Sequence, residues 1–444
     1  MRIVNGLILV LGLFSATNSF GLSRNLDDNQ VLRKPGKLSK FSVKVTHIKF
    51  DYLGGNENKS DALNIRRGSG KNNDLSHKGN GVGSGEWNYK GRNEPALYVA
   101  NKRVKIKARL TATPGAIQWA DIEAKAVRGL LRNVVKRPVQ FVNGISHPEY
   151  VTFELDGPTS SSIEKIIDSW QWKASNIKRQ GAATRRSYRS GELTEKTYSK
   201  NITLSGPHTV YTVLNLPKAP WYRNDDNHHP WVSALDFAIV TAGTNGMKHI
   251  GEAAAAFTDF IYSSHGLIYS SKDMGGSRYF RFKKLKKQAS PIRGIFSLTN
   301  FIQRRSNFVN CQDITAAVQT LINLVGGDSQ FAHRTKFGYL NTVKLIGVGK
   351  SNNPFFNHSG IANQKVVGKD DLWFDANKDG FRDRTYFKFH TYVLLRGKVY
   401  DATLGPYKRF SEGAYMAAVI DKSIKAEADK AKGSKIFGIP LGLE

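Results

Sequence analysis

The sequence has little that could cross-link the chain, and few acidic residues. Only one cysteine, Cys311, occurs in 444 residues, so no disulfide can form within the chain. Acidic residues number 36 against 66 lysines and arginines, which gives a formal net charge of +30. The sequence has no internal repeat. Stability must therefore come from a buried core, and a length of 444 residues favours two domains or one large core with insertions.

The excess of positive charge favours anionic partners, such as cell-surface or cell-wall polymers, acidic glycans and membranes. Basic clusters lie at 102–107, 185–189 and 278–287, so the charge is spread along the chain. Only 278–287 alternates aromatic and basic residues, as proteins that bind single-stranded nucleic acid do. A strand with one solvated basic face explains that alternation equally well. Nucleic acid is therefore not the partner we expect.

The N-terminal residues follow the pattern of a secretory signal. A basic start at Arg2 precedes an apolar run at 6–14, and small residues follow up to Gly21. This run is shorter than the about 20 residues that a membrane-spanning helix needs, and no other segment is longer or more apolar. We therefore expect a signal peptide at 1–21 and a secreted or periplasmic protein with no transmembrane span in the mature chain. An uncleaved lipid anchor or an ordinary first strand is the alternative.

Strand patterns dominate the chain up to residue 216. Residues alternate between apolar and polar, or form short β-branched runs, at 41–52, 96–100, 104–112, 117–124, 139–142, 150–155 and 209–214. The segment 54–94 is rich in Gly, Asn, Lys and Ser and indicates a long loop. We predict a β-sandwich-like domain over 36–216. Pro217 and Pro220 then mark its boundary.

The second half of the chain combines helix and strand patterns. Helices are predicted at 232–240 and 252–262, and a helix or strand at 295–302. A helix from Cys311 follows, then strands at 342–348, 385–395 and 398–404 and a closing helix at 415–431. We therefore predict an α+β fold, with the β-sandwich-like domain followed by an α+β domain over 217–444.

The helix that begins at Cys311 is the most informative segment. Asn310 is a suitable N-cap, and Asp313 stands where a carboxylate completes a capping box. Apolar residues at helical spacing predict one buried stripe: Ile314, Ala317, Val318, Leu321, Ile322 and Val325. In the first turn, free backbone N–H groups favour a thiolate and could also hold an oxyanion. The alternative is that a lone cysteine is a small buried apolar residue.

A histidine and an aspartate stand on two strands joined by a short turn. If Arg396-Gly397 forms a two-residue hairpin turn, Leu394 faces Val399, and His390 lies diagonal to Asp401 on one face. Diagonal Cα atoms are about 7–8 Å apart, within reach of an imidazole and a carboxylate. A shift of one residue would place Asp401 on the other face. Taken alone, such a histidine is more often structural; together with a cysteine at a helix start it predicts a proton shuttle.

This order of Cys, His and Asp resembles the transglutaminase-like superfamily of papain-type cysteine enzymes. The similar motifs are 310–313, 389–393 and 397–403, and the resemblance covers roughly 300–410. It implies that 217–444 is a transglutaminase-like catalytic domain with Cys311 as nucleophile, His390 as general base and acid, and Asp401 orienting the imidazole. It also implies an acyl-thioester intermediate and no organic cofactor. The superfamily includes protein cross-linkers, peptidases and amidases.

The sequence departs from the compact members in two respects. An insertion occupies about 349–384, and the residue that assists an oxyanion is not evident. Gln303, Trp221 and Trp231 are the candidates for that role, although packing is the more ordinary function of either tryptophan.

The insertion contains a candidate calcium loop that resembles the short loops of secreted repeat modules. The expected ligands are Asp375, Asn377, Asp379, the carbonyl of Phe381, and Asp383, with Gly380 at the sixth position. The twelfth position is Tyr386, where a full EF-hand has a glutamate. We expect a structural calcium ion. A plain Asp/Asn/Gly turn is the alternative.

The sequence therefore predicts a secreted cysteine-dependent amide hydrolase or acyltransferase, of protease or amidase type, acting on a protein or peptide. The first alternative is a calcium-dependent protein cross-linking transglutaminase. The second is a catalytically inactive basic module that binds surfaces.

Overall fold

The structure is a computed structural model that describes residues 42–53, 60–67, 81–113, 115, 117–179, 200–221, 229–270, 276–284, 292–341, 343–350, 373–374, 384–422 and 425–444. The expected signal peptide (1–21) lies outside these residues. Residues from Val43 to Glu444 cluster as one compact unit. The division near residue 216 stays a prediction. Among the described residues, no helix combines the length and apolar character needed to cross a bilayer.

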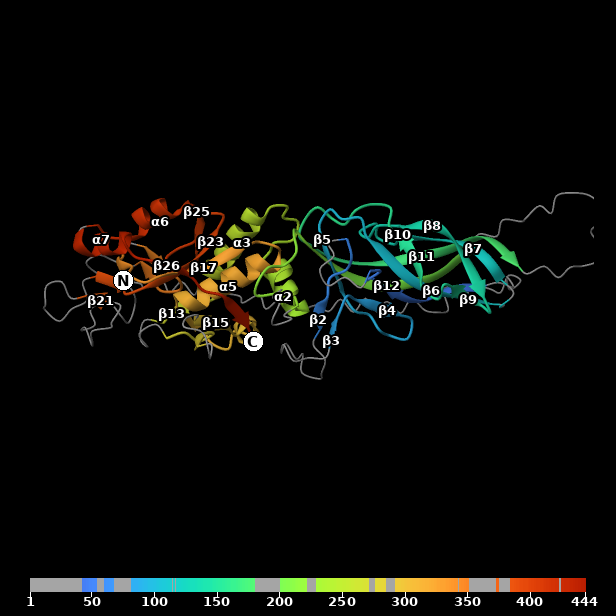
Figure 1. The fold of residues 1–444 in the computed structure, drawn as a ribbon, viewed down its shortest axis with the longest axis horizontal. Helices are drawn as coiled ribbons and strands as arrows, with labels where there is room; N and C mark the ends of the chain where they lie inside the picture. Colours follow the sequence, from blue (N-terminus) through green and yellow to red (C-terminus); the bar gives the residue numbers. More distant parts are fainter. Residues whose placement is uncertain are drawn as a thin grey trace, which may run out of the picture. The chain divides into compact units, whose positions relative to one another are not determined.

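The N-terminal part is built on one ten-stranded sheet (Figure 1). Its strands are β1 (Ser42–Lys49), β4 (Glu86–Asn88), β5 (Ala96–Val99), β6 (Lys105–Thr113), β7 (Ile117–Ala126), β8 (Val134–Val142), β9 (Ile145–His147), β10 (Val151–Glu154), β11 (Glu164–Arg179) and β12 (Lys200–Val213). Their order is β4-β1-β6-β9-β8-β7-β11-β12-β5, with β10 paired to β6. Strand β12 pairs antiparallel with β11 and parallel with β5.

The two ends of this sheet approach each other, so that it is nearly closed. The backbone N–H of Val45 on β1 donates to Thr203 Oγ1 on β12 at 3.4 Å, and Asn93 Nδ2 donates to the carbonyl of Pro207 at 2.6 Å. Inside, Trp170 and Trp172 pack edge to face with ring centroids 6.3 Å apart. The predicted β-rich character of this half is confirmed, although ten of its strands form one curled sheet and not a two-sheet sandwich.

Two predictions in this half are wrong in detail. The predicted loop at 54–94 contains β2 (Ile65–Arg67) and β3 (Gly81–Gly83), paired antiparallel, as well as β4. Strand β11 was not predicted, although it is the longest of the sheet. Its pairing with β12 shifts register between Asp168 and Trp170 and again between Gln171 and Lys173, and such shifts interrupt the alternation by which a strand is recognised.

The C-terminal part contains the remaining elements. Its helices are α2 (Val232–Asp236), continued by the π-helix η1 (Phe237–Thr241), α3 (Ile250–Ser263), α4 (Leu298–Ile302), α5 (Cys311–Leu324), α6 (Glu412–Val419) and α7 (Lys425–Lys432). Its strands are β13 (Ile268–Tyr269), β14 (Phe280–Lys284), β15 (Ile292–Phe296), β16 (Phe308–Val309), β17 (Ser329–Arg334), β18 (Gly338–Tyr339), β19 (Lys344–Leu345), β20 (Gly349–Lys350), β21 (Trp373–Phe374), β22 (Arg384–Phe387), β23 (His390–Leu395), β24 (Lys398–Asp401), β25 (Tyr407–Ser411), β26 (Ile436–Gly438) and β27 (Leu441–Leu443). A five-stranded sheet, β25-β24-β23-β17-β26, lies beside α5 (Figure 1).

Helix α5 is buried on every side. All fourteen of its residues are buried, including polar ones, so the prediction of a single buried stripe is wrong. Two of these polar side chains find partners in the sheet: Thr315 Oγ1 hydrogen-bonds Thr391 Oγ1 at 3.0 Å, and Gln319 Nε2 donates to the carbonyl of Ser329 at 3.0 Å. These bonds offset part of the cost of burying the two side chains, so apolar periodicity alone understates how deep the helix lies.

Two further predictions in this half need correction. The predicted closing helix at 415–431 is two helices, α6 and α7, because Ile420 is extended (φ −96°, ψ 129°) and bridges to Leu340. The predicted strand at 385–395 is divided into β22 and β23. The segment 295–302 was predicted to be either a helix or a strand. The structure has both there, since β15 ends within it and α4 follows.

Candidate catalytic site

Cys311 is the first residue of α5, and a capping box fixes its position. Asn310 Oδ1 accepts hydrogen bonds from the backbone N–H groups of Gln312 (2.9 Å) and Asp313 (3.1 Å). Asp313 Oδ2 accepts from the backbone N–H of Asn310 at 3.1 Å. The predicted N-cap and capping box are confirmed.

The capping box also limits the chemistry at this helix start. The sequence suggested that free backbone amides of the first turn could hold an oxyanion. The amides of Gln312 and Asp313 cannot do so, because both are bound by Asn310. The backbone N–H of Cys311 itself is the amide of the first turn that the cap leaves available.

Asp313 additionally ties the helix start to β14. Its carboxylate accepts backbone hydrogen bonds from Arg278 (2.9 Å), Tyr279 (2.8 Å) and Phe280 (2.7 Å). Burial raises the pKa of Asp313, and these backbone donors oppose that shift. Asp313, two residues after Cys311, is thus held by several independent hydrogen bonds, which fix the position of the cysteine.

His390 and Asp401 form a buried pair on β23 and β24. The two-residue turn gives the predicted register, with Leu394 opposite Val399. His390 Nε2 lies 3.0 Å from Asp401 Oδ2. The other ring nitrogen, Nδ1, is buried and has no hydrogen-bond partner within the described residues. The imidazole is therefore oriented by a carboxylate through one nitrogen, while the second is left for proton exchange.

Asp401 is itself held in place by two further groups. Its Oδ1 accepts from the backbone N–H of Thr403 at 2.7 Å, and its Oδ2 accepts from the hydroxyl of Tyr415 at 2.7 Å. Tyr415 comes from α6, so this helix supports the orienting carboxylate from outside the sheet. Sequence reasoning missed Tyr415, because helical spacing does not show which strand residue a helix side chain will meet.

His390 interacts electrostatically with Cys311 as well as with Asp401. Burial alone would lower the pKa of His390, but the Asp401 carboxylate and then the Cys311 side chain outweigh it and raise the pKa to about 9. The imidazole is therefore protonated at neutral pH. The His390 ring thus interacts with a carboxylate on β24 and with the Cys311 side chain at the start of α5.

Aromatic rings enclose the three residues. The His390 ring centroid lies 4.6 Å from that of Phe337 and 5.5 Å from that of Phe387. Phe387 in turn stacks on Tyr269 at 5.5 Å. Only 2% of Cys311, 0% of His390 and 2% of Asp401 is exposed to solvent. The site is closed in this conformation.

Tyr269 is the second residue that sequence reasoning missed. Burial, followed by the nearby Cys311, Asp313 and Asp401, raises its pKa well above the ordinary value of 10. Its hydroxyl therefore keeps its proton and can act as a hydrogen-bond donor. It lies on the two-residue strand β13, which is too short to give a periodic signal.

The structure places the sequence candidates for an oxyanion donor elsewhere. Trp221 Nε1 donates to the carbonyl of Thr320 at 2.9 Å, and Trp231 packs edge-on against Trp221 at 5.7 Å. Thr320 is nine positions after Cys311, which corresponds to about 13 Å along an α-helix. Gln303 is exposed and accepts a hydrogen bond from Arg305 Nε. In the part of the chain that the structure describes, no hydrogen bond joins Gln303, Trp221 or Trp231 to Cys311.

The predicted calcium ligands Asp375, Asn377, Asp379, Phe381 and Asp383 lie outside the described residues. Within the described residues, no three His, Cys, Asp or Glu side chains gather to hold a metal ion. Calcium stays a prediction from the sequence.

Comparison with known proteins gives a structural likeness at low sequence identity. No family model matches this sequence, and a search of curated proteins found no match. Among solved structures, the chain is similar to the crystal structure of red sea bream transglutaminase, with a sequence identity of 11% and a TM-score of 0.29. The match covers 73% of this chain and 51% of that chain, so this chain spans about half the length of that protein.

Proposed function

We propose that the protein is a secreted or periplasmic cysteine-dependent amide hydrolase or acyltransferase that acts on a protein or peptide through Cys311, His390 and Asp401. The observation that carries the proposal is the buried His390–Asp401 pair, with Nε2 and Oδ2 3.0 Å apart, whose imidazole also interacts with Cys311 at the start of α5. This arrangement supports a transglutaminase-like catalytic domain in the C-terminal half.

The chemistry would proceed in two steps. The Cys311 sulfur attacks the carbonyl carbon of an amide, and the carbonyl π electrons move to oxygen to give a tetrahedral oxyanion. Collapse of the oxyanion breaks the C–N bond, and His390 gives its proton to the leaving nitrogen. Water or an amine, deprotonated by His390, then attacks the thioester and releases Cys311 as thiolate. Asp401 keeps the imidazole oriented in both steps.

The oxyanion needs donors that the cap has not used. The backbone N–H of Cys311 remains available, and the Tyr269 hydroxyl keeps its proton beside the sulfur. An oxyanion hole is commonly formed by backbone N–H groups together with side-chain hydrogen-bond donors. We therefore assign Tyr269 as the side-chain donor of the proposed mechanism.

The decisive experiment uses the fact that the chain has one cysteine, so that thiol labelling reports on Cys311 alone. Labelling by iodoacetamide and hydrolysis of a fluorescent casein are measured for the parent chain, Cys311→Ala, His390→Gln and the control His249→Gln, whose side chain is exposed. Both activities should disappear in Cys311→Ala, and hydrolysis should fall by at least 100-fold in His390→Gln. Turnover that persists in Cys311→Ala would refute the proposal.

Hydrolysis and cross-linking differ in the second nucleophile. Incorporation of a fluorescent primary amine into casein, with release of ammonia, would select the transglutaminase alternative over peptide hydrolysis. The same assays with and without a chelator test the calcium prediction, since a structural ion that binds at 375–383 should also raise the temperature of unfolding. A chelator that changes neither quantity would remove calcium from the proposal.

The second candidate is an inactive basic module that binds anionic cell-surface or cell-wall polymers. Two observations favour it: the net charge of +30 and the closure of the triad, in which each residue is at most 2% exposed. Adhesion to an anionic envelope that weakens with salt, and that is unchanged in Cys311→Ala, would support this function.

A further inference from the structure

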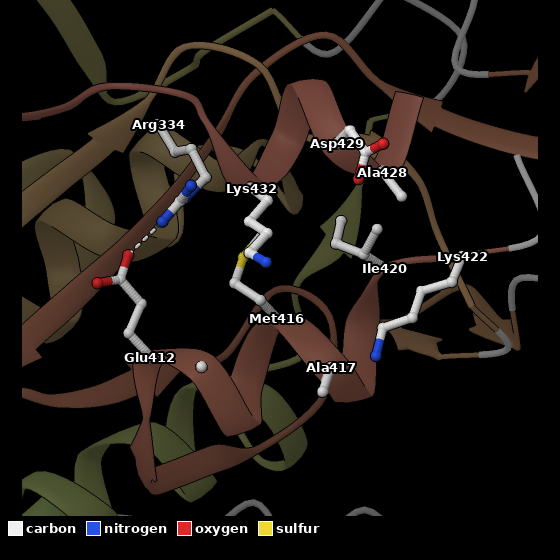
Figure 2. A pocket seen from close by; sticks show the side chains of 10 residues that line it. Arg334, Glu412, Met416, Ala417, Ile420, Lys422, Ala428, Asp429 and Lys432 are labelled. Atoms are coloured by element: carbon white, nitrogen blue, oxygen red, sulfur yellow. Dashed lines mark hydrogen bonds and ion pairs between the residues drawn. The ribbon is translucent and has the colours of Figure 1, made fainter. Parts of the chain in front are cut away.

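A pocket of about 620 Å³ lies between α6 and α7, next to the end of β17 (Figure 2). Its lining residues are Arg334, Glu412, Gly413, Met416, Ala417, Ile420, Lys422, Ala428, Asp429 and Lys432. None of these belongs to the proposed triad. The volume falls within the range of about 300–1,000 Å³ that small-molecule sites occupy.

One wall of the pocket is a charged pair that is already satisfied. Arg334 is 5% exposed and donates to Glu412, to the carbonyl of Ala431 at 2.7 Å and to Ser434 Oγ at 2.8 Å. Glu412 also accepts from the hydroxyl of Tyr392 at 2.7 Å. These hydrogen bonds hold both side chains in place. Because the two charges compensate each other, this wall adds no net charge for a ligand to neutralise.

The charge available to a ligand comes from the other side chains. Lys422 and Lys432 are exposed, and neither amine has a partner among the described residues, while Asp429 supplies one carboxylate. Figure 2 shows Lys432 reaching into the pocket from α7, and Lys422 on the side opposite the Arg334–Glu412 pair. Two free cations and one anion leave a net charge of +1 at this site.

The rest of the lining is apolar. Met416 and Ala417 come from α6, Ile420 from the break that follows it, and Ala428 from α7. Methionine and small aliphatic residues bind flexible hydrocarbon groups without demanding one shape. The pocket thus combines an apolar floor with cations at its edge.

We propose that this pocket is a binding site for a small amphipathic anion, with one negatively charged head group and a short apolar tail. The head group neutralises the net charge that Lys422 and Lys432 create, and the tail lies over Met416, Ala417 and Ile420. A cation of the same shape would meet the two amines and be repelled, and a neutral analogue would gain only the apolar contact.

The site is tested by titrating the full chain with octanoate, octylammonium and octanol, each in competition with the fluorescent anion 1-anilinonaphthalene-8-sulfonate. Octanoate should compete best, and its affinity should fall as salt is raised. Lys422→Met and Lys432→Met should each weaken octanoate by about 2- to 5-fold, the range of exposed ion pairs. Lys435→Met is the matched control, because Lys435 is exposed and does not line the pocket.

Ala417→Trp tests the location independently. The larger side chain would occupy the pocket and abolish competition by octanoate, whereas Ala414→Trp, on the same helix and outside the lining, should leave it unchanged. Circular dichroism confirms that each variant is folded. Equal affinity for octanoate and octylammonium, or undiminished binding in Ala417→Trp, would overturn the proposal. Cys311→Ala should bind normally, so the result does not depend on the proposed catalysis.

Discussion

The His390–Asp401 pair should make the stability of the protein depend on pH in a defined window. Its imidazole is buried, and Asp401 and Cys311 outweigh the effect of that burial and raise the pKa of His390 to about 9. In the unfolded chain a histidine has a pKa of about 6.5. The folded state therefore holds the proton more tightly than the unfolded state does.

The direction and the magnitude follow from this difference. Below pH 6.5 both states are protonated, and the stabilisation by the charged pair is fully present; it is lost as the pH rises through 9. A difference of about 2.5 pKa units, at about 1.36 kcal/mol per unit, gives about 3 kcal/mol. That is a large share of the free energy of unfolding of an ordinary domain, about 5–15 kcal/mol.

The assay compares urea unfolding at several pH values between 6 and 10. The test variant carries His390→Gln with Asp401→Asn, which replaces the pair by two neutral amides and leaves no buried charge alone. The control carries His249→Gln with Asp328→Asn, both at exposed positions. Lysines and tyrosines that do not interact with the pair contribute equally to all three proteins, so they cancel in the comparison.

The free energy of unfolding of the parent chain should fall by about 3 kcal/mol relative to the test variant across this window, and the control should follow the parent. Parallel curves for the parent and the test variant would refute the reasoning, because they would mean that His390 has the same pKa in both states.

Three further changes follow from other buried groups. Tyr415→Phe removes a donor to a charged carboxylate and should cost about 2 kcal/mol of unfolding free energy, whereas Tyr262→Phe, at a half-exposed hydroxyl, should cost less. Asp313→Asn replaces an acceptor of four backbone N–H groups by an amide with one acceptor oxygen, and should cost on the order of 3 kcal/mol in the same urea assay. Burial lowers the pKa of His208 to about 3, so the parent chain should lose stability relative to His208→Phe as the pH falls from 6.5 towards 3, by up to about 5 kcal/mol in acid unfolding.

The local signals around the site could be predicted because they depend on neighbours in the sequence. The capping box needs only Asn310 and Asp313, three residues apart, and both of its hydrogen bonds are present. The register of β23 and β24 depends on the two-residue turn between them, and it places His390 against Asp401 as that turn requires. Short-range chemistry of this kind determines geometry before any tertiary contact is known.

Other features depend on which distant elements meet, and the sequence does not carry that information. Trp221 and Trp231 were candidates for an oxyanion donor, but they pack on each other near Thr320, away from the cysteine. Tyr269 and Tyr415 reach the site from β13 and α6, on either side of the triad in the sequence, and no spacing relates them to it. The full burial of α5 likewise results from the sheet and helices that surround it.

The enclosure of the triad determines which side of the site must move for a substrate to enter. A carbonyl carbon has to reach the sulfur, and Cys311 is 2% exposed. The helix side is fixed, because Asn310 and Asp313 hold the start of α5 through a reciprocal cap and further backbone bonds. Phe387 covers the site beside His390 and stacks on Tyr269, whose own backbone N–H is bound to the carbonyl of Ile346. Rotating the Phe387 side chain breaks no backbone hydrogen bond, whereas displacing a capped helix breaks several, so we expect access to the sulfur to open at Phe387 while Cys311 and the Tyr269 hydroxyl stay in place.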